Sequence, residues 1–310
     1  MLVNHNGAAC LGRTLEELAR NTVTDDVECI VVDSGSADGS WEGVEQVWPR
    51  ARVLRFEENV GFCVGCNRGA EEGSGRLLAF VNFDGQVEPG WDMPLAGLLD
   101  DPTVSISTGL LLSSDGAVIQ AAGLSIAPNT AVVGRLDMLP REMAPGEPID
   151  VPAATGALMM VRRQEFLDLG GFYEPFFMYG EEADYCLRVP GRVVLTPASA
   201  IRHEYGHAAG PRFSPLRRYL LSRNRLVNAS RNLPDAALAK AVLSSAAFDA
   251  ATLARSPSAP ALRAVLRGWR DGLAVMPRER RTGDGAERRA AAKRLVSFRE
   301  AYAQHRRLPS

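Results

Sequence analysis

The first hundred residues alternate short apolar runs with amphipathic helical patterns, and this alternation limits the fold more than any other feature of the chain. The apolar runs predict strands at 1–3, 29–33, 51–56 and 76–84. Leu11, Leu15 and Leu18 recur at helical spacing after the first of them, a short helix that carries Val44 and Val47 is expected after the second, and another helix is expected within 58–73. Strands that alternate with helices are typical of an α/β sheet. Only three residues precede the turn NHNG, so we expect an unusually short first strand.

The remainder of the chain divides into an irregular part and a helical part. Residues 103–203 contain strand-like runs, a Pro-rich loop and one short helix, and they end on a strand that leads to His203. The pattern is helical from Ser214 onward, and breaks rich in Pro, Gly and Ser predict helices at 215–233, 235–254, 259–275 and 284–306. We therefore predict a catalytic-type α/β domain at 1–210 and a helical C-terminal region at 211–310.

The charge distribution supports the same division. Residues 1–210 carry 14 arginines, no lysine and 30 acidic residues, a net charge of −16, whereas residues 211–310 carry +14. A basic tail is suited to pairing with the acidic part, with an anionic membrane or with an anionic acceptor. In the last predicted helix, Leu295, Phe298 and Tyr302 recur at helical spacing. That face favours internal packing or a homodimer, with membrane contact as the alternative.

The cysteines and the N-terminus suggest an intracellular protein. Five scattered cysteines are typical of a reducing compartment, and the pair Cys63-x-x-Cys66 lacks a second ligand pair for zinc, so we interpret both as small buried residues. No apolar run reaches about 20 residues, and the segment MLVNHNG has no signal-peptide pattern. We expect a cytoplasmic protein, with peripheral contact at the inner membrane face as the alternative, and no nucleic-acid partner.

Polar residues follow several of the predicted strands. Asp33 ends one strand, and in open α/β sheets ligands bind at the carboxyl ends of strands, where a carboxylate can contact a nucleotide base or ribose. A helix cap or turn is the alternative role. Neither G-x-G-x-x-G after the first strand nor G-x-x-x-x-G-K-[ST] occurs in the chain.

A second polar group suggests a weak cation site. Asp84 is predicted to end the fourth strand, and strand geometry would place it on one face with Asn82. An amide and a carboxylate need diphosphate oxygens and water to complete a Mg²⁺ or Mn²⁺ shell, and a turn-forming aspartate is the alternative. His203 ends another strand, before Glu204, Tyr205 and His207, and it is either structural or a ligand.

The third group is an acidic cluster after an aromatic turn. Glu181, Glu182 and Asp184 fall within four residues. Desolvation and like-charge repulsion both disfavour ionised carboxylates in such a place. The cluster therefore predicts a metal site, a catalytic base or a salt-bridge network.

Seven segments in this order resemble family 2 glycosyltransferases of the GT-A fold, most closely the bacterial rhamnosyltransferase-like branch. They are NHNG, VVDSGSADGS, ENVGFCVGCNRG, VNFDGQVEPGW, GALMMVRR, GGFYEPFFMYGEEADYCLR and the RH that ends at His203. The resemblance covers residues 1–207, and SRNRLVNASRN at 222–232 resembles the segment that often follows. It implies a Rossmann-like nucleotide-diphospho-sugar transferase core and inverting transfer of a sugar from a dTDP-, UDP- or GDP-linked donor to an acceptor hydroxyl.

The resemblance also implies roles for individual residues. Glu182 falls at the position of the catalytic base, beside Glu181 and with Asp184 in the same cluster, although the family usually has Asp there. Asp33 falls where the family contacts the nucleotide. The implied donor-pocket residues are Asn4, Asn6, Gly61 and Asn67. The implied cation site consists of the motif with Asn82 and Asp84, completed by His203. The implied acceptor is a glycan, a lipid-linked glycan or a small molecule.

Two other functions fit parts of the pattern. A sugar nucleotidyltransferase usually carries a Gly-rich loop with Arg or Lys after the first strand, and NHNGAACLG offers none. A non-catalytic sugar-nucleotide-binding or scaffold protein would explain the altered motif Asn-Phe-Asp at 82–84 and the glutamate at 182. Turnover of the donor would distinguish an enzyme from such a binding protein.

Overall fold

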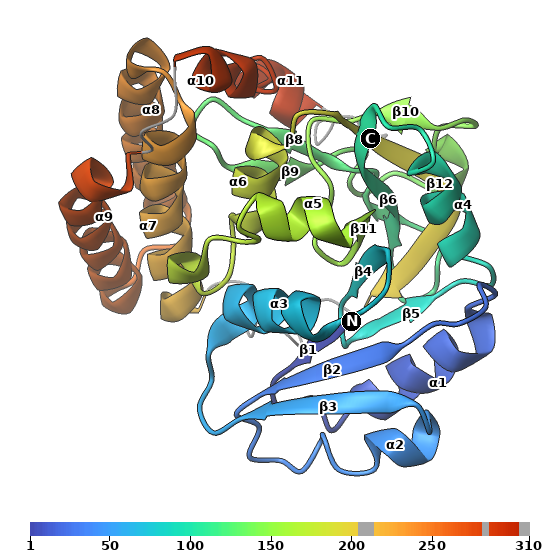
Figure 1. Cartoon of the computed structure of the whole chain (residues 1–310). Coiled ribbons are helices and arrows are strands. Elements are labelled where there is room, and N and C mark those ends of the chain that lie inside the picture. Colours follow the sequence, from blue (N-terminus) through green and yellow to red (C-terminus); the bar gives the residue numbers. More distant parts are fainter. Residues whose placement is uncertain (204–213, 281–284, 304–310) are drawn as a thin grey trace.

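The N-terminal part is a three-stranded parallel sheet with helices on both faces (Figure 1). The computed structural model describes residues 1–203, 214–280 and 285–303. The strand order is β1-β2-β3, and Asn4, Asp33 and Arg55 are register partners, so the carboxyl ends of these strands lie side by side. The elements are β1 (Leu2–Asn4), α1 (Leu11–Asn21), β2 (Cys29–Ser34), α2 (Val44–Val47), β3 (Ala51–Phe56) and α3 (Gly61–Glu72).

A second, mixed sheet continues this surface. The Met1 ammonium group donates to Ala79 O at 2.7 Å, and Val81 N donates to Met1 O at 3.1 Å, so β4 lies beside the start of β1. The order is β10-β12-β6-β11-β4, with β5 on β12 and β7 on β6. These strands are β4 (Leu77–Val81), β5 (Gly85–Val87), β6 (Val104–Leu112), β7 (Ile119–Ala121), β10 (Ile149–Asp150), β11 (Leu158–Arg162) and β12 (Arg192–His203).

Short elements connect and cover the second sheet. The strands β8 (Leu124–Ile126) and β9 (Val132–Gly134) form a separate hairpin. The other elements are helical, and they are α4 (Asp92–Leu98), η1 (Arg141–Met143), α5 (Arg163–Asp168), η2 (Glu174–Phe176) and α6 (Glu181–Arg188). Beneath α6, the rings of Phe80, Phe166, Phe172 and Tyr185 pack with centroids 5.1–5.6 Å apart. This aromatic cluster fixes α6 on the sheet.

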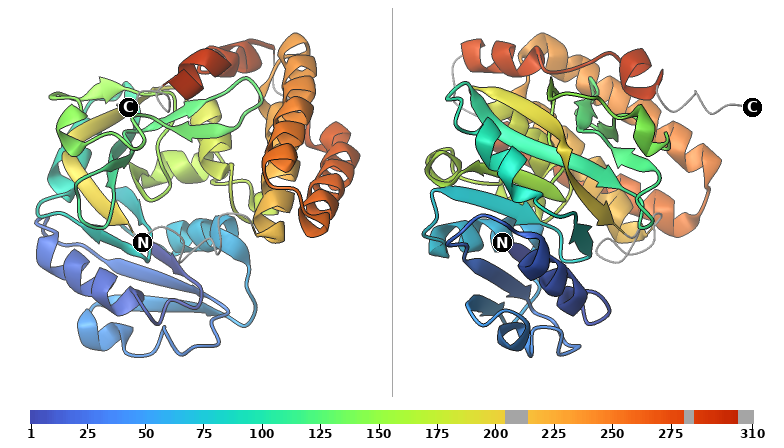
Figure 2. Two further views of the ribbon diagram at one scale, coloured as in Figure 1. Left: turned by 180° about the vertical axis from the view of Figure 1, so that it is seen from behind. Right: turned by 90° about the vertical axis from the view of Figure 1, so that its right-hand side faces the viewer.

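The C-terminal helices form a layer beside α6 (Figures 1 and 2). Close approach of α9 to α7 requires glycine, because a Cβ atom on Gly268 would lie 2.7 Å from Tyr219 O and one on Gly272 would lie 3.0 Å from a Leu226 methyl carbon. The helices are α7 (Pro215–Asn232), α8 (Asp235–Arg255), α9 (Ala259–Glu279), α10 (Gly285–Ala292) and α11 (Phe298–Ala303).

Several sequence predictions differ from the structure. The strand predicted at 76–84 ends at Val81, because residues 82–84 form a turn into β5, so the shared strand face predicted for Asn82 and Asp84 is wrong. The single helix predicted at 284–306 is interrupted, because Val296 N donates to Ile126 O and draws the chain onto β8. The predicted domain boundary at 210 lies outside the described residues and stays a prediction.

Candidate active site

Asp33 organises the loop at the carboxyl end of β2. Its side chain is fully buried, and Oδ1 accepts hydrogen bonds from Asn4 Nδ2 at 2.8 Å and Ser36 Oγ at 2.5 Å. The Ser36 amide donates to the other oxygen at 3.2 Å. A carboxylate with these partners closes the turn after the strand, as Asx turns do. The nucleotide contact expected of Asp33 stays a prediction, and any effect of Asp33 on a ligand also acts through this loop.

The two asparagines of NHNG tie the first loop to the second. Asn4 Nδ2 also donates to Ser40 Oγ at 2.8 Å. Asn6 has a left-handed backbone, with φ of 53°, and its Oδ1 accepts a hydrogen bond from Ala37 N at 2.9 Å. Both residues therefore lie at the carboxyl edge of the parallel sheet, where the sequence predicted the donor pocket.

Gly61 connects this edge to the loop before the acidic helix. It begins α3 with φ of +82°, and a Cβ atom there would lie 2.6 Å from Phe177 O. The amide of Cys63 donates to the same carbonyl oxygen at 3.1 Å. The first turn of α3 thus contacts the loop Phe177–Gly180 directly. Cys63 and Cys66 are buried on this helix, and burial raises the pKa of both thiols.

Asn67 lies within α3 and not on a loop. Its Nδ2 donates to Phe172 O at 2.8 Å, and its Oδ1 accepts from Phe172 N at 2.8 Å. A Cβ atom on Gly171 would lie 2.3 Å from that Oδ1, so only glycine fits beside the amide. These contacts favour a role in holding the aromatic turn, and the donor-pocket role expected for Asn67 gains no support from them.

Asp84 and His203 are brought together by strand register. His203 is the register partner of Gly85 across β12 and β5, which places it beside Asp84. The His203 Nε2 and Asp84 Oδ1 atoms are 3.0 Å apart, and the two side chains are 15% and 0% exposed. Glu204, Tyr205 and His207 lie outside the described residues. Within the described part of the chain no group of three or more His, Cys, Asp or Glu side chains is placed to hold a metal.

The loop before the acidic helix has an unusual backbone. Phe177 has φ of 67° and ψ of −60°, and Met178 N donates to Phe176 O at 2.8 Å, which defines a classic γ-turn. Tyr179 and Gly180 follow with φ of 69° and 91°. Positive φ at non-glycine residues costs about 1–3 kcal/mol each and persists only where the surroundings fix it. The two glutamates follow this strained segment directly.

Glu181 and Glu182 form a coupled pair at the start of α6. Burial, and next the charge of Glu182, raise the pKa of Glu181 well above its usual value. Burial also raises the pKa of Glu182, although hydrogen bonds from Glu181 and from the Gly180 amide favour its ionised form. One carboxyl of a close pair holds the proton more tightly than the other. The pKa of Glu181 is therefore raised further than that of the half-buried Glu182, which makes Glu182 the stronger acid of the pair.

A row of asparagines on α7 fixes the strained loop, and sequence reasoning missed it. Asn224 Nδ2 lies 3.1, 2.9 and 2.8 Å from the carbonyl oxygens of Phe176, Met178 and Tyr179. Asn228 Nδ2 donates to Gly180 O at 3.1 Å. Asn232 Nδ2 donates to Asp184 Oδ1 at 2.8 Å. The signal was available in the sequence, since asparagines four residues apart share one helix face.

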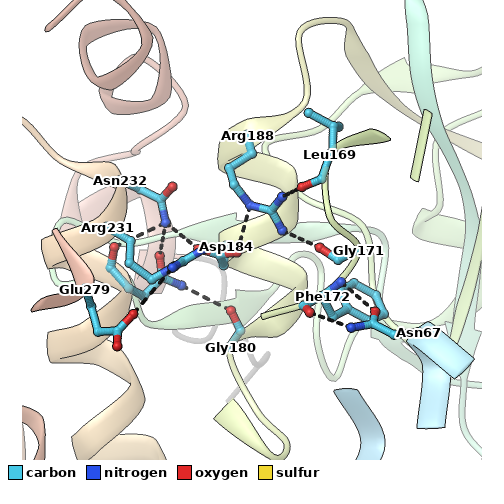
Figure 3. A network of polar contacts seen from close by, with 11 residues as sticks. Asn67, Leu169, Gly171, Phe172, Gly180, Asp184, Arg188, Arg231, Asn232 and Glu279 are labelled. Carbon is cyan, nitrogen blue, oxygen red and sulfur yellow. Dashed lines mark hydrogen bonds and ion pairs between the residues drawn. The ribbon is translucent and has the colours of Figure 1, made fainter. Parts of the chain in front are cut away.

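Asp184 anchors α6 to α7 (Figure 3). Its fully buried carboxylate pairs with Arg188 Nε at 2.8 Å and Arg231 Nε at 3.0 Å. Burial alone would raise the pKa of Asp184, but the two guanidinium groups and Asn232 hold it below the usual value. Arg188 also donates to the carbonyl oxygens of Leu169 and Gly171, at 2.6 Å each. These contacts favour a salt-bridge role over the catalytic role predicted for Asp184.

The candidate groups meet along one edge through backbone contacts. Asn82 N donates to Ala157 O at 3.0 Å, and the adjacent Gly156 lies against the Glu181 side chain, whose Oε1 would be 4.0 Å from a Cβ atom there. Val60 N donates to Ser34 Oγ at 2.9 Å, which joins the Asp33 loop to α3. The edge thus combines a polar loop, a carboxylate–imidazole pair and a glutamate pair in which one member can accept a proton.

Comparison with known proteins gives a consistent family. A model described as glycosyl transferase family 2 matches residues 1–169. The O-antigen biosynthesis protein RfbC of Myxococcus xanthus is 29% identical over 209 residues, and the match covers 62% of this chain and 16% of that protein. An N-acetylglucosaminyl-diphospho-decaprenol L-rhamnosyltransferase of Mycobacterium tuberculosis is 27% identical over 216 residues, and the match covers 59% of this chain and 68% of that protein.

Solved structures match nearly the whole chain at low identity. S. aureus TarS 1–349 in complex with UDP-GlcNAc gives a TM-score of 0.62 at 14% identity and covers 98% of this chain and 90% of that one. GalNAc-T7 with UDP, GalNAc and Mn²⁺ gives 0.61 at 17% identity and covers 97% of this chain and 55% of that one. At this identity the likeness concerns the fold.

Proposed function

Because the chain belongs to glycosyl transferase family 2, we propose that it transfers a sugar from a nucleoside diphosphate donor to an acceptor hydroxyl with inversion. The predicted family and the predicted GT-A fold are both confirmed. The observation that carries the proposed activity is the edge where the Asp84–His203 pair and the Glu181–Glu182 pair meet the loops at the carboxyl ends of β1 and β2. The proposed division remains an α/β domain up to residue 210 and a helical region after it.

The donor would lie against the N-terminal loops. Asn4, Asn6 and Asp33 shape those loops, and a nucleotide at the carboxyl edge of the sheet would contact them. UDP is present in the GalNAc-T7 structure, and the TarS structure contains UDP-GlcNAc, so UDP-linked sugars are the first donors to test, followed by dTDP- and GDP-linked sugars.

Asp84 and His203 are the residues that would hold a divalent cation. Their facing atoms, Asp84 Oδ1 and His203 Nε2, are buried 3.0 Å apart, so the pair fits a small cation with oxygen ligands from a diphosphate. An imidazole ligand favours Mn²⁺ over Mg²⁺. A bound cation would neutralise charge on the leaving diphosphate. Asn82 lies in the same turn and would contact the donor.

Glu182 is the proposed base. It is more exposed than Glu181, its carboxylate accepts a hydrogen bond from Gly180 N at 3.1 Å, and Glu181 retains the shared proton. An ionised Glu182 can therefore take the proton of an acceptor hydroxyl while that oxygen attacks the anomeric carbon. A single displacement inverts the configuration at that carbon. Glu181 acts on the reaction through Glu182.

The acceptor is proposed from the relatives. The mycobacterial relative carries a lipid-linked acceptor, a diphospho-decaprenol, in its name, and the myxobacterial relative is named for O-antigen biosynthesis. A glycan on a polyprenyl diphosphate is therefore the first acceptor class to test, ahead of a free polysaccharide or a small molecule. The protein that carries out such a reaction would work at or near the cytoplasmic membrane face.

Two matched variants test the proposal. Glu182→Gln keeps size and hydrogen bonding but cannot accept a proton, so turnover should fall by roughly 10²–10⁴-fold while donor binding stays nearly unchanged. Glu181→Gln reproduces a protonated neighbour and should retain most activity. Donor turnover and a thermal-shift screen of nucleotide sugars with and without Mn²⁺ provide the measurements. A severe loss in Glu181→Gln alone would assign the base to Glu181, and no turnover with any donor would favour a binding protein.

A further inference from the structure

The outer face of α9 exposes three leucines. Leu262, Leu266 and Leu273 are 47%, 59% and 47% exposed. Their spacing of four and seven residues places them within about 40° of one another on an α-helix. The opposite face of α9, which includes Ala264 and Gly268, is buried, with Gly268 against α7. The leucines are therefore not needed for the packing of this helix.

Arginines lie beside the leucines on the same exposed side. Arg263, Arg267 and Arg270 alternate with them along the helix, and the side chains of Arg267 and Arg270 are 67% and 73% exposed. The neighbouring acid is Asp271, which is 26% exposed and pairs with both of those arginines. We call these six residues the leucine–arginine face; it consists of Leu262, Arg263, Leu266, Arg267, Arg270 and Leu273.

The neighbouring helix α8 also exposes apolar residues. Trp269 of α9 donates from its indole nitrogen to Asp249 Oδ2 of α8 at 2.8 Å, which joins the two helices. Leu243 on α8 is 73% exposed, and most other exposed residues of that helix are alanines. By length and composition α8 is also apolar enough to cross a membrane. Only 17% of its most apolar 18-residue stretch is buried inside the structure. Both helices lie at the outer edge of the molecule (Figure 1).

We propose that the leucine–arginine face docks on an anionic lipid surface. Leucine side chains that enter the headgroup region, flanked by arginines on lipid phosphates, are typical of helices that lie in a membrane interface. A second copy of the chain fits this face less well. Two-fold pairing would bring two rows of arginines together, and among the described residues of the face Asp271 is the acid that would offset them on each copy.

Internal packing, a homodimer or membrane contact was predicted for a different helical face, that of Leu295, Phe298 and Tyr302. Leu295 lies beside Ile126, and Phe298 and Tyr302 pack with Ala127 and Val133, so these side chains cover the β8–β9 hairpin. The leucine–arginine face has no such cover among the described residues. Its apolar residues are therefore available to a partner.

The leucine–arginine face is joined to the candidate active site by two stacking contacts. The Arg267 guanidinium lies 4.9 Å from the centre of the Tyr219 ring on α7. Arg217, two residues earlier on α7, lies 5.2 Å from the centre of the Tyr179 ring in the loop before the acidic helix. The docking itself does not depend on the proposed activity.

Vesicle flotation of the full chain tests the proposal. The wild-type protein should bind vesicles of equal parts phosphatidylcholine and phosphatidylglycerol and should not bind vesicles of phosphatidylcholine alone. It should dissociate from the anionic vesicles as the salt concentration increases. Changing all three leucines of the face to serine should lower binding about tenfold or more. The double variant Arg263→Gln/Arg270→Gln should lower binding about fivefold for each charge.

A matched control uses three methionines elsewhere on the surface. Met93, Met138 and Met143 are 56%, 55% and 58% exposed, and their joint change to serine should leave binding unchanged. Circular dichroism confirms that each variant is folded. The proposal is overturned if wild type fails to float with anionic vesicles at low salt, or if the methionine variant loses as much binding as the leucine variant. A leucine-dependent dimer that ignores vesicles would assign the face to a second copy.

Discussion

Asn224→Ala should release the strained loop that presents the glutamates. The amide of Asn224 has two N–H groups directed at three carbonyl oxygens, those of Phe176, Met178 and Tyr179. Two hydrogen bonds at about 0.5–1.5 kcal/mol each contribute about 1–3 kcal/mol to the closed loop. Since a tenfold change in an equilibrium constant is about 1.4 kcal/mol, loop opening should become about 5–150-fold more frequent. The γ-turn at Phe177 favours opening as well.

Hydrogen–deuterium exchange of the peptide that spans residues 174–188 measures this opening without any substrate. The reporting amides are those of Met178 and Asp184, which donate to Phe176 O and Gly180 O in the closed loop. Asn21→Ala is the matched control, because Asn21 is also buried and donates to a backbone carbonyl, that of Val87, at 2.8 Å. If exchange in 174–188 rises no more in Asn224→Ala than in Asn21→Ala, the asparagine row does not hold the loop.

The other predictions concern single carboxylates. Asp84→Asn should remove any Mn²⁺-dependent gain in nucleoside diphosphate affinity, and calorimetry that shows an unchanged gain would reject the cation site. Asp33→Ala should weaken nucleotide binding through its loop by on the order of 1–3 kcal/mol, and an unchanged nucleotide affinity would leave Asp33 with a structural role alone. Asp184→Asn should lower the free energy of unfolding by about 3–5 kcal/mol in urea, because Arg188 and Arg231 lose their buried partner, and a change under about 1 kcal/mol would contradict that role. Because the folded pKa of Glu181 is raised, stability should fall as pH rises above the ordinary value of 4.5, and Glu181→Gln should flatten that fall; equal pH profiles would refute the assignment.

Much of the fold was predictable because its signals are local. Leu11, Leu15 and Leu18 are buried on α1 as their spacing indicates, and β3 has the predicted bounds of Ala51–Phe56. The strand ending at Asp84 was mispredicted because the Asn-Phe-Asp segment turns toward β5, and that pairing depends on β12, more than a hundred residues away. The last helix was mispredicted for a similar reason, since its break is set by contact with β8.

The candidate site was predictable as a set of residues but not as a set of contacts. The sequence places Asp84 and His203 far apart, and only the register of β5 against β12 brings them to 3.0 Å. The acidic cluster predicts three similar carboxylates, yet Asp184 faces two arginines and Glu181 faces Glu182. Which carboxylate is paired depends on α7, whose asparagines are ordinary polar residues until the helix is packed.

The asparagine row also limits how this protein can be divided or recombined. The family match ends at residue 169, before the glutamates, and the side chains that hold their loop come from residues 224–232. A shortened chain that stops after β12 would retain Glu181 and Glu182 but lose the amides that hold them in place. A chimaera with a foreign tail would have the same defect unless that tail supplied matching donors. The helical tail and the acidic helix therefore form one structural unit, and modular exchange at their junction would separate the reactive groups from the conformation they require.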